Sequence, residues 1–477
     1  MSIICPSLFL MHSDKICVIG AGPAGLATAY ELTKKGYKVD VYEADKQVGG
    51  MSRSFNLWGQ IVDLGPHRFF STDKRINNLW LEIAGGEYQE VNRITRVFYQ
   101  GKYFYYPLKV MNVLSNLGLF TSAMCMLSYA KERLSPTKPD GSFENWVVSR
   151  FGRRLFEIFF KTYSEKLWGI SCKDLDSDFA AQRIKKLSLM EAVINAFKGG
   201  KGNTHKSLVD QFYYANGGTG QIYEKMAAYV AQNGGNIHLG KRIHGLSVDG
   251  TVVNGIIDEN QQKIAYDHVI SSMPITQLVQ HLPSAPAAVQ DAVSQLEFRN
   301  TVLVYLEIDG IDLFPDNWLY VHSPQLKTGR ITNFRNWVPE LYGNKQTTIL
   351  VLEYWCNFDD AEWSMPDLDF ENLAKKELIE TGLHQGKEIL NSHVFKIPRC
   401  YPIYKVGYKD HLEVMTEYLK TFQNFQAVGR YGSFKYNNQD HSLLMGILAA
   451  ENIENGYAHN LWDINTDYDS YQEETQD

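Results

Sequence analysis

The N-terminal part of the chain shows two apolar runs separated by a segment with helical spacing. Residues 15–20 are apolar and end in a glycine turn, which predicts a buried strand. Residues 23–35 carry apolar side chains at helical intervals, and residues 37–43 alternate as a second strand. Two strands joined by a helix form a βαβ unit, so this region predicts a parallel sheet with a right-handed crossover.

Further along, the period of the pattern changes. Residues 92–106 alternate around a Gln-Gly turn and predict an antiparallel hairpin, whereas residues 107–200 are mainly helical in period. Ser142 is expected to cap a helix whose apolar stripe extends to Phe159. Longer strands of a second sheet are predicted at residues 299–309 and 347–356.

The C-terminal half returns to the pattern of the first layer. The glycine-rich residues 216–220 open a helix, and residues 426–432 form a strand that runs into a glycine turn. A helix is predicted from about residue 440 to residue 455. The chain is therefore expected to leave the first layer and come back to it, which makes its domains discontinuous.

Composition narrows the functional classes. The 477 residues are 44% hydrophobic and 21% charged, which excludes a disordered chain and a polytopic membrane protein. A formal charge of −7 does not favour a nucleic-acid partner, which normally meets a basic face. The six cysteines form no Cys-x-x-Cys pair, so we predict free thiols, no metal site and a cytoplasmic location.

Residues 110–130 form an uncharged segment between Lys109 and Lys131 that is long enough to cross a bilayer. Asparagines, serines and a threonine interrupt it, so we predict a buried helix or helix pair and no integral membrane span. A helix that touches a membrane is the alternative. Residues 1–13 lack a basic start and are interpreted as a short extension rather than a signal peptide.

The glycine turn after the first strand has the spacing of a dinucleotide site. Gly20 permits a tight turn, Gly22 permits close approach of a pyrophosphate, and Gly25 permits packing of the helix on the strand. Glu43 ends the second strand, where a carboxylate can accept both ribose hydroxyls. The alternative, an ordinary tight turn beside an exposed glutamate, fits fewer of these features together.

A second glycine turn follows Glu43, at Gly49-Gly50-Met51, with Arg53 just after it. Together the two turns resemble the extended FAD fingerprint of the glutathione-reductase-like flavoprotein superfamily, in its amine-oxidase branch. A nicotinamide enzyme does not need the second turn. FAD is therefore the cofactor that the resemblance implies. Arg53 could reach the cofactor or could be a surface arginine.

Several separated segments resemble UDP-galactopyranose mutase and its flavoprotein relatives, in the same order along nearly the whole chain. They are GAGPAGL, GPHRFF, VNR, the aromatic run FFKTYSEKLWG, YPI, and VGRYG with Tyr436 and Asp440. The resemblance implies that N5 of reduced FAD attacks the anomeric carbon of a nucleotide sugar, whose ring opens and recloses as a furanose without net redox change. It implies a small-molecule partner, a nucleotide-diphosphate sugar, and a possible homodimer.

The resemblance also implies site residues. It places His67, Trp168, Arg183 and Arg330 in catalysis. It places Asn92, Phe159, Phe160, Tyr163, Tyr401 and Tyr436 at the substrate. It places Gly20, Gly22, Pro23, Ala24, Gly25, Glu43, Gly50, Met51, Arg53, Gly65, His67, Gly429, Arg430 and Asn438 at the cofactor.

Two positions depart from the family pattern. Phe70 replaces a usual second histidine, and Asn438 replaces a usual aspartate. Each predicted residue also has a structural alternative: Phe159 and Phe160 as core, Arg183 in a solvated basic face, Arg330 as a turn residue and Tyr401 as a packing residue. These alternatives stay open at this stage.

The resemblance implies an α/β fold with a glutathione-reductase-like FAD-binding Rossmann domain, a helical insert and an antiparallel substrate sheet. The FAD-binding domain is expected at residues 14–90, 207–275 and 395–460. The helical insert is expected at residues 107–206, the sheet domain at 91–106 and 276–394, and an acidic tail at 461–477.

Two further functions remain alternatives to a mutase. One is an FAD-dependent oxidoreductase of the amine-oxidase or protoporphyrinogen-oxidase type, acting on an amine, a lipid-like or a porphyrin-like substrate. The other is a flavin-binding protein without turnover. Arginines that face the substrate favour the mutase, because guanidinium groups bind phosphate. An apolar cavity open to a membrane favours the oxidoreductase.

Overall fold

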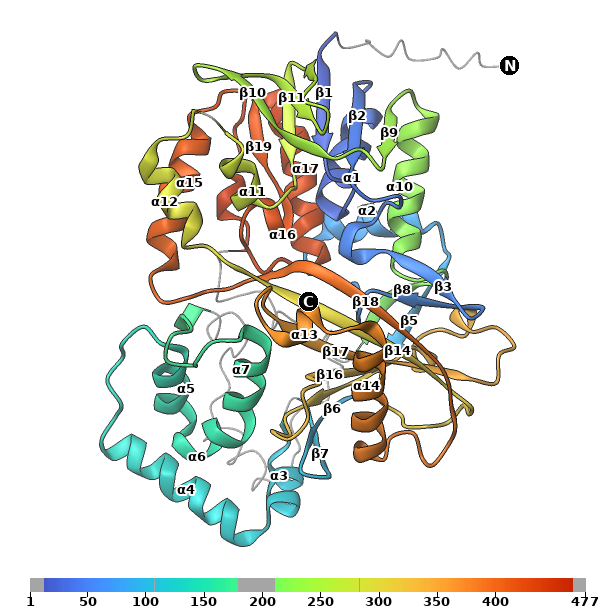
Figure 1. The fold of residues 1–477 in the computed structure, drawn as a ribbon, viewed down its shortest axis with the longest axis vertical. Coiled ribbons are helices and arrows are strands. Elements are labelled where there is room, and N and C mark those ends of the chain that lie inside the picture. Colours follow the sequence, from blue (N-terminus) through green and yellow to red (C-terminus); the bar gives the residue numbers. More distant parts are fainter. Residues whose placement is uncertain (1–12, 107, 179–210, 283, 466–477) are drawn as a thin grey trace.

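The structure is a computed structural model that describes residues 13–106, 108–178, 211–282 and 284–465. The predicted site residue Arg183 lies outside the described residues. The described chain forms one layer on a parallel sheet, a second layer on a mostly antiparallel sheet, and a group of helices beside the second sheet (Figure 1). The predicted mixed α/β architecture is confirmed.

A five-stranded parallel sheet forms the first layer. Its order is β19-β13-β1-β2-β9, so strands that are far apart in the sequence lie side by side (Figure 1). All residues of β1 after Lys15 are buried, as expected for a parallel strand covered on both faces. The strands are β1 (Lys15–Ile19), β2 (Lys38–Glu43), β9 (Asn236–Leu239), β13 (His268–Ser271) and β19 (Phe425–Ala427).

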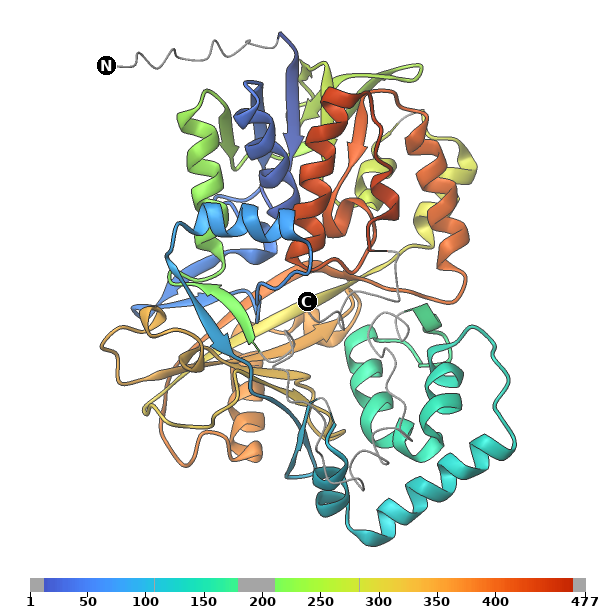
Figure 2. The same ribbon diagram turned by 180° about the vertical axis from the view of Figure 1, so that it is seen from behind.

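Helices pack closely on this sheet (Figure 2). The predicted crossover helix is α1 (Pro23–Lys34), which contacts α17 (Gln439–Asn455). A Cβ on Gly446 of α17 would lie 2.6 Å from the carbonyl oxygen of Ala24, so glycine lets the two helices approach. The layer also contains α2 (Lys74–Ala84), α10 (Gly220–Gln232), α11 (Ile275–Gln280), α12 (Ala287–Ser294), α15 (Tyr408–Lys420), α16 (Gly429–Gly432), and a small antiparallel sheet of β10 (Ile243–Asp249), β11 (Val252–Asp258) and β12 (Lys263–Ala265).

The second layer is a seven-stranded sheet in the order β18-β14-β17-β16-β15-β6-β7. Neighbouring strands are antiparallel except β15 and β6, which are parallel. Residues along β14 alternate between two apolar clusters: Val302 and Val304 pack with helix α14, and Leu303 and Tyr305 pack toward the other face. The elements are β6 (Thr95–Tyr99), β7 (Lys102–Tyr105), β14 (Phe298–Ile308), β15 (Trp318–Val321), β16 (Arg330–Asn333), β17 (Thr348–Cys356), β18 (Ile389–Pro402) and α14 (Asp367–Thr381).

Short helices replace the single long helix predicted after Ser142. The Oγ of Ser142 accepts a 3.2 Å bond from the N–H of Asn145, so the predicted cap is confirmed. The helix stops at Gly152, which has φ 82° and ψ 154°. A Cβ there would lie 2.8 Å from the backbone nitrogen of Tyr129, and this close contact explains the break. The helices are α5 (Phe143–Phe151), α6 (Arg153–Phe156), a π-helical turn (Glu157–Lys161) and α7 (Thr162–Trp168).

The apolar segment 110–130 forms an exposed helix pair. α3 (Val110–Leu117) and α4 (Leu119–Leu134) meet at a bend of 119°. The predicted pair is confirmed, but the predicted burial is wrong, because Leu119 and Phe120 are 88% and 81% exposed. Among the described residues no single helix is long and apolar enough to cross a membrane, and only this bent pair passes such a test.

Two antiparallel ribbons complete the fold. β3 (Ser54–Leu57) pairs with β4 (Gln60–Asp63), and β5 (Tyr88–Asn92) pairs with β8 (Gln211–Ala215). The predicted hairpin begins at Thr95 rather than at residue 92. The predicted domain boundary at residue 395 falls inside β18, so the domain division stays a prediction. The remaining short helices are residues 50–52, 334–336, 339–341, 361–364 and 461–463.

Candidate active site

The loop between β1 and α1 forms one end of a large cavity. Gly20 has φ 97°, and a Cβ on Gly25 would lie 2.0 Å from the carbonyl oxygen of Gly20, so these glycines bring the helix onto the strand. Gly22 differs, because a Cβ there would meet only the Cα of Gly50, at 3.9 Å. This open space at a helix N-terminus fits the pyrophosphate of a dinucleotide.

Glu43 lies beside this loop at the end of β2. Its Oε2 accepts a 2.8 Å bond from the N–H of Ala21, and its Oε1 accepts a 2.9 Å bond from the N–H of Asp45. These bonds hold the carboxylate at the cavity wall, with lone pairs left for ribose hydroxyls. Arg53 instead pairs with Asp45, lies 5.2 Å from the ring centre of Phe395, and does not line the cavity.

The cavity has a volume of about 880 Å³ and extends from the β1–α1 loop to α3 and α4. It brings together residues predicted from four separate parts of the sequence, at residues 20–67, 159–163, 330 and 401–438. The predicted residues that line it are Gly20, Gly22, Pro23, Ala24, Glu43, Gly50, Met51, His67, Phe159, Phe160, Tyr163, Arg330, Tyr401, Gly429, Arg430, Tyr436 and Asn438. The predicted residues that do not line it are Gly25, Arg53, Gly65, Asn92 and Trp168.

Arg330 forms a two-point ion pair with Glu353 of the neighbouring strand. Its Nε lies 2.8 Å from Oε1 and its Nη2 lies 2.5 Å from Oε2. Burial works to lower the pKa of Arg330, but the carboxylate of Glu353 raises it well above its usual value. Gly65 makes room for this carboxylate, because a Cβ there would lie 3.2 Å from Oε1. The pair has no net charge and leaves Nη1 of Arg330 for a ligand.

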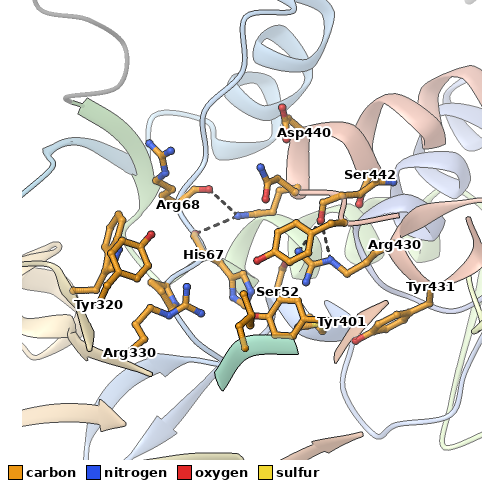
Figure 3. Close-up of a pocket in the computed structure, with 18 of the residues that line it drawn as sticks. Ser52, His67, Arg68, Tyr320, Arg330, Tyr401, Arg430, Tyr431, Asp440 and Ser442 are labelled. Atoms are coloured by element: carbon orange, nitrogen blue, oxygen red, sulfur yellow. Dashed lines mark hydrogen bonds between the residues drawn. The ribbon is translucent and has the colours of Figure 1, made fainter. Parts of the chain in front are cut away.

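Arg430 brings an uncompensated positive charge to the centre of the cavity. Its Nε and Nη2 donate to the backbone carbonyl of Asn437 at 2.9 Å and 2.7 Å. Its guanidinium lies 5.3 Å from the ring centre of Tyr401 (Figure 3). It lies 4.8 Å from the ring centre of Tyr436. In the described part of the chain no carboxylate pairs with it. A buried cation of this kind suits an anionic or electron-rich ligand.

His67 lies between Arg330 and Arg430 at the cavity wall (Figure 3). Burial, together with the charges of Arg430 and Arg330, lowers the pKa of His67 to about 3, so the ring is neutral. Its buried Nδ1 has no hydrogen-bond partner among residues 13–106, 108–178, 211–282 and 284–465. Gln439 fixes the local backbone by donating to the carbonyls of His67 and Arg68. A buried, unpartnered nitrogen at this wall fits a bound cofactor or substrate.

Aromatic rings form the wall opposite the glycine turns. Tyr163 stacks on His322 with ring centres 4.9 Å apart and meets Tyr320 edge-on at 5.4 Å. Burial, with the charge of Lys166, lowers the pKa of His322 to about 3, so this ring is also neutral. Tyr320 and His322 are two residues apart where the chain leaves β15, so both face the cavity.

The other predicted aromatic residues are partly or wholly core. Trp168 is fully buried, contacts the ring of Tyr436 and does not line the cavity. Phe159 meets Phe104 edge-on at 5.1 Å, and Phe160 stacks on a neighbouring phenylalanine, yet both line the cavity. Core packing and ligand contact are therefore compatible at both positions.

In the motif VNR, the predicted substrate residue was Asn92, but the residue that lines the cavity is its neighbour Arg93. Asn92 ends β5, is exposed, and its Oδ1 accepts a 2.9 Å bond from Gln211. Arg93 lines the cavity, and its buried Nε has no partner within the described chain. Adjacent residues of an extended segment face opposite sides, so only one of the two can reach the cavity, and the sequence pattern does not show which. Sequence reasoning also missed Arg68, Tyr320, His322 and Gln439.

The two departures from the family pattern both line the cavity. Asn438 begins α17, where its side chain accepts from the N–H of His441 while its own N–H donates to His441 Nδ1 at 3.1 Å. An aspartate could accept the same capping bond, so the change removes a charge and keeps the cap. Phe70 adds apolar surface to the cavity wall.

The far end of the cavity is apolar. The lining residues of this end come from α3, α4, α5 and α6. We call this end the apolar arm, and its residues are Val113, Leu114, Leu117, Cys125, Phe143, Phe151 and Leu155.

Comparison with known proteins agrees with this geometry. Residues 23–398 match the family described as flavin-containing amine oxidoreductase. A 4,4'-diapophytoene desaturase (4,4'-diapolycopene-forming) from Methylomonas sp. is 22% identical over 71% of this chain and 68% of its own length. A probable UDP-galactopyranose mutase from Klebsiella pneumoniae is 27% identical over 35% of this chain and 44% of its own length.

A crystal structure of reduced UDP-galactopyranose mutase has the same fold. It superposes with a TM-score of 0.82 and 22% identity, covering 95% of this chain and 98% of that one. The predicted resemblance and the predicted cofactor, FAD, are confirmed. The open space at Gly22, the carboxylate of Glu43 and the cation of Arg430 are the features that fit this cofactor.

Proposed function

The chain belongs to the flavin-containing amine oxidoreductase family, and from this premise we propose that it rearranges the ring of a diphosphate-linked sugar without net redox change. One observation carries the proposal: Arg68, Arg93 and Arg330 line the same cavity as the residues that fit the cofactor. Guanidinium groups bind phosphate oxygens in a fixed fork geometry. Hydride transfer from an uncharged substrate needs orientation and an electron acceptor, but no such set of cations.

The chain's own residues would bind and orient the substrate. Reduced FAD, when bound, supplies a nucleophilic nitrogen for the anomeric carbon. Arg93 and Nη1 of Arg330 would hold the phosphates, assisted by the hydroxyl of Tyr401. The rings of Tyr163 and His322 would pack against the sugar and exclude water. The diphosphate is the leaving group, so its fixation also keeps it close for the return step.

The reaction itself gives the first test. Reduced protein, kept without oxygen, is mixed with UDP-galactopyranose, and the furanose isomer is followed by chromatography. We expect turnover only with the reduced protein, and many turnovers per reducing equivalent supplied. The proposal would be contradicted if a substrate bleached the absorbance of the oxidised flavin and no sugar isomer formed.

Two neighbouring residues provide a matched test of the arginine site. We expect Arg93→Ala to raise the Kd of UDP by about tenfold to a hundredfold, because a charge-assisted hydrogen bond contributes ~1.5–3 kcal/mol. Asn92→Ala is the control and should leave the Kd unchanged, since Asn92 does not line the cavity. Calorimetric titration measures both. Arg330→Ala is a poorer test, because it leaves the buried carboxylate of Glu353 unpaired.

The apolar arm favours a second candidate, an FAD-dependent oxidoreductase acting on a lipid-like substrate. The arm would accept a hydrocarbon chain, as the similarity to a diapophytoene desaturase also suggests. In that case the oxidised flavin should lose its absorbance when a lipid-like donor is added without oxygen. UDP should then bind no better to the wild type than to Arg93→Ala.

A further inference from the structure

Helix α4 has its apolar face turned away from the protein. Its buried residues include Ser122, Tyr129 and Glu132, which lie along one side of the helix. Phe120 and Leu127 lie on the opposite side and are 81% and 63% exposed. A helix that packs on a protein core normally buries its apolar stripe, so this arrangement is inverted.

The exposed stripe is continuous along the helix pair. Side chains at positions 120, 124 and 127 recur at helical spacing, and the exposed residues at 111 and 119 extend the surface across the bend. We call this surface the α3–α4 face. Its exposed apolar residues are Met111, Leu119, Phe120, Met124, Leu127 and Leu134. An apolar surface of this extent indicates an interaction site.

Basic residues surround the α3–α4 face in a chain that is acidic overall. Between residues 108 and 139 the basic residues are Lys109, Lys131, Arg133 and Lys138, and the one acid is Glu132, which is buried. Lys109 precedes α3, and Lys131 and Arg133 lie in the last turn of α4. Cations on long flexible side chains at the borders of an apolar surface suit anionic lipid headgroups.

The geometry fits a surface-bound pair rather than a span. α4 has 16 residues, a length of about 24 Å at 1.5 Å per residue, which is shorter than the ~30 Å hydrocarbon core. The bend of 119° at Gly118 turns the two helices away from a common axis. The inner side of the same pair lines the apolar arm, through Val113, Leu117 and Cys125.

We propose that the α3–α4 face docks on the surface of an anionic lipid bilayer, with the helix pair lying in the headgroup region. This inference concerns where the protein works and holds for either candidate reaction. The exposed stripe enters the bilayer, and Lys109, Lys131 and Arg133 contact lipid phosphates. A substrate with an apolar chain could then pass between the bilayer and the arm along one helix pair.

Sedimentation of the FAD-loaded full chain with vesicles tests the proposal. We expect binding to vesicles of phosphatidylglycerol and phosphatidylcholine, weaker binding to phosphatidylcholine alone, and release by salt. The double variant F120S/L127S should lower the partition coefficient by about tenfold or more, because it removes two large apolar groups from the stripe. K131E/R133E should remove the dependence on anionic lipid.

Helix α14 offers a matched control. Leu368 and Ile379 are 66% and 55% exposed there, away from the α3–α4 face, and L368S/I379S should bind vesicles like the wild type. Flavin absorbance checks that every variant keeps its fold. The proposal is overturned if the wild type does not sediment with anionic vesicles, or if F120S/L127S binds as tightly. It is also overturned if neither protein binds lipid and light scattering shows that the wild type is a dimer whereas F120S/L127S is a monomer.

Discussion

Gly22 and Gly25 lie in the same turn, but glycine is required at each position for a different reason. A Cβ on Gly25 would lie 2.0 Å from a backbone oxygen, whereas one on Gly22 would point into the cavity. We expect Gly22→Val to fold and to weaken FAD binding by roughly a hundredfold or more, because the side chain occupies the pyrophosphate space. Gly25→Ala should instead destabilise the fold. Flavin absorbance and circular dichroism of the purified variants separate the two outcomes.

The burial of His322 predicts how the free energy of unfolding changes with pH. Its pKa is about 3 in the folded protein, against about 6.5 in an unfolded chain. The unfolded state therefore binds more protons between these values, and stability is lost as the pH falls from 6.5 toward 3. At pH 4.5 we expect this histidine to cost about 2–3 kcal/mol of unfolding free energy. In urea unfolding, acidification to pH 4.5 should therefore lower the free energy of unfolding of His322→Asn by about 2–3 kcal/mol less than that of the wild type.

Equal slopes for His322→Asn and the wild type would show that His322 is not held neutral by burial.

At the level of elements, two glycines that each separate a pair of helices can be compared directly. Gly118 and Gly152 share almost the same backbone angles, φ 79° and ψ 162° against φ 82° and ψ 154°. A Cβ on Gly118 meets nothing within 4 Å, while one on Gly152 would lie 2.8 Å from Tyr129. Gly118→Ala should cost ~1–3 kcal/mol of backbone strain, and Gly152→Ala should cost more, because α4 must also move. Urea unfolding measures both, and equal losses would contradict a role for the contact.

Elements built from local pattern could be predicted, and contacts between distant elements could not. The βαβ unit around Gly20, the cap at Ser142 and the helix after residue 438 follow from spacing and capping chemistry. The stop at Gly152 depends on Tyr129, which is distant in sequence. The ion pair of Arg330 likewise depends on strand register, which pairs it with Glu353.

The same distinction applies to the candidate site. The glycines and Glu43 could be located because a nucleotide turn uses consecutive residues. Arg93 could not be separated from Asn92 without knowing which side of an extended segment faces inward. Exposure of the apolar stripe on α4 was invisible as well, because periodicity shows that a stripe exists and not what covers it.

At the scale of the whole molecule, the cavity is lined by residues from several layers, and each layer is made of segments that are far apart in the sequence. Glu43 comes from the parallel sheet, Arg330 from the antiparallel sheet, and Phe159 from the helices beside it. A ligand that touches all three ties the layers together, because each contact adds stability only in the assembled state.

The strand order of the parallel sheet sets a limit on when a growing chain can load its cofactor. β1 pairs with β13, and β13 pairs with β19 at residues 425–427, so the sheet is unfinished until the ribosome has passed residue 427. Arg430 and α17 come later still. FAD capture should therefore follow translation. A chain ended at residue 420 should elute without flavin, and flavin retained by that truncated chain would show that residues 1–420 bind it without β19 and α17.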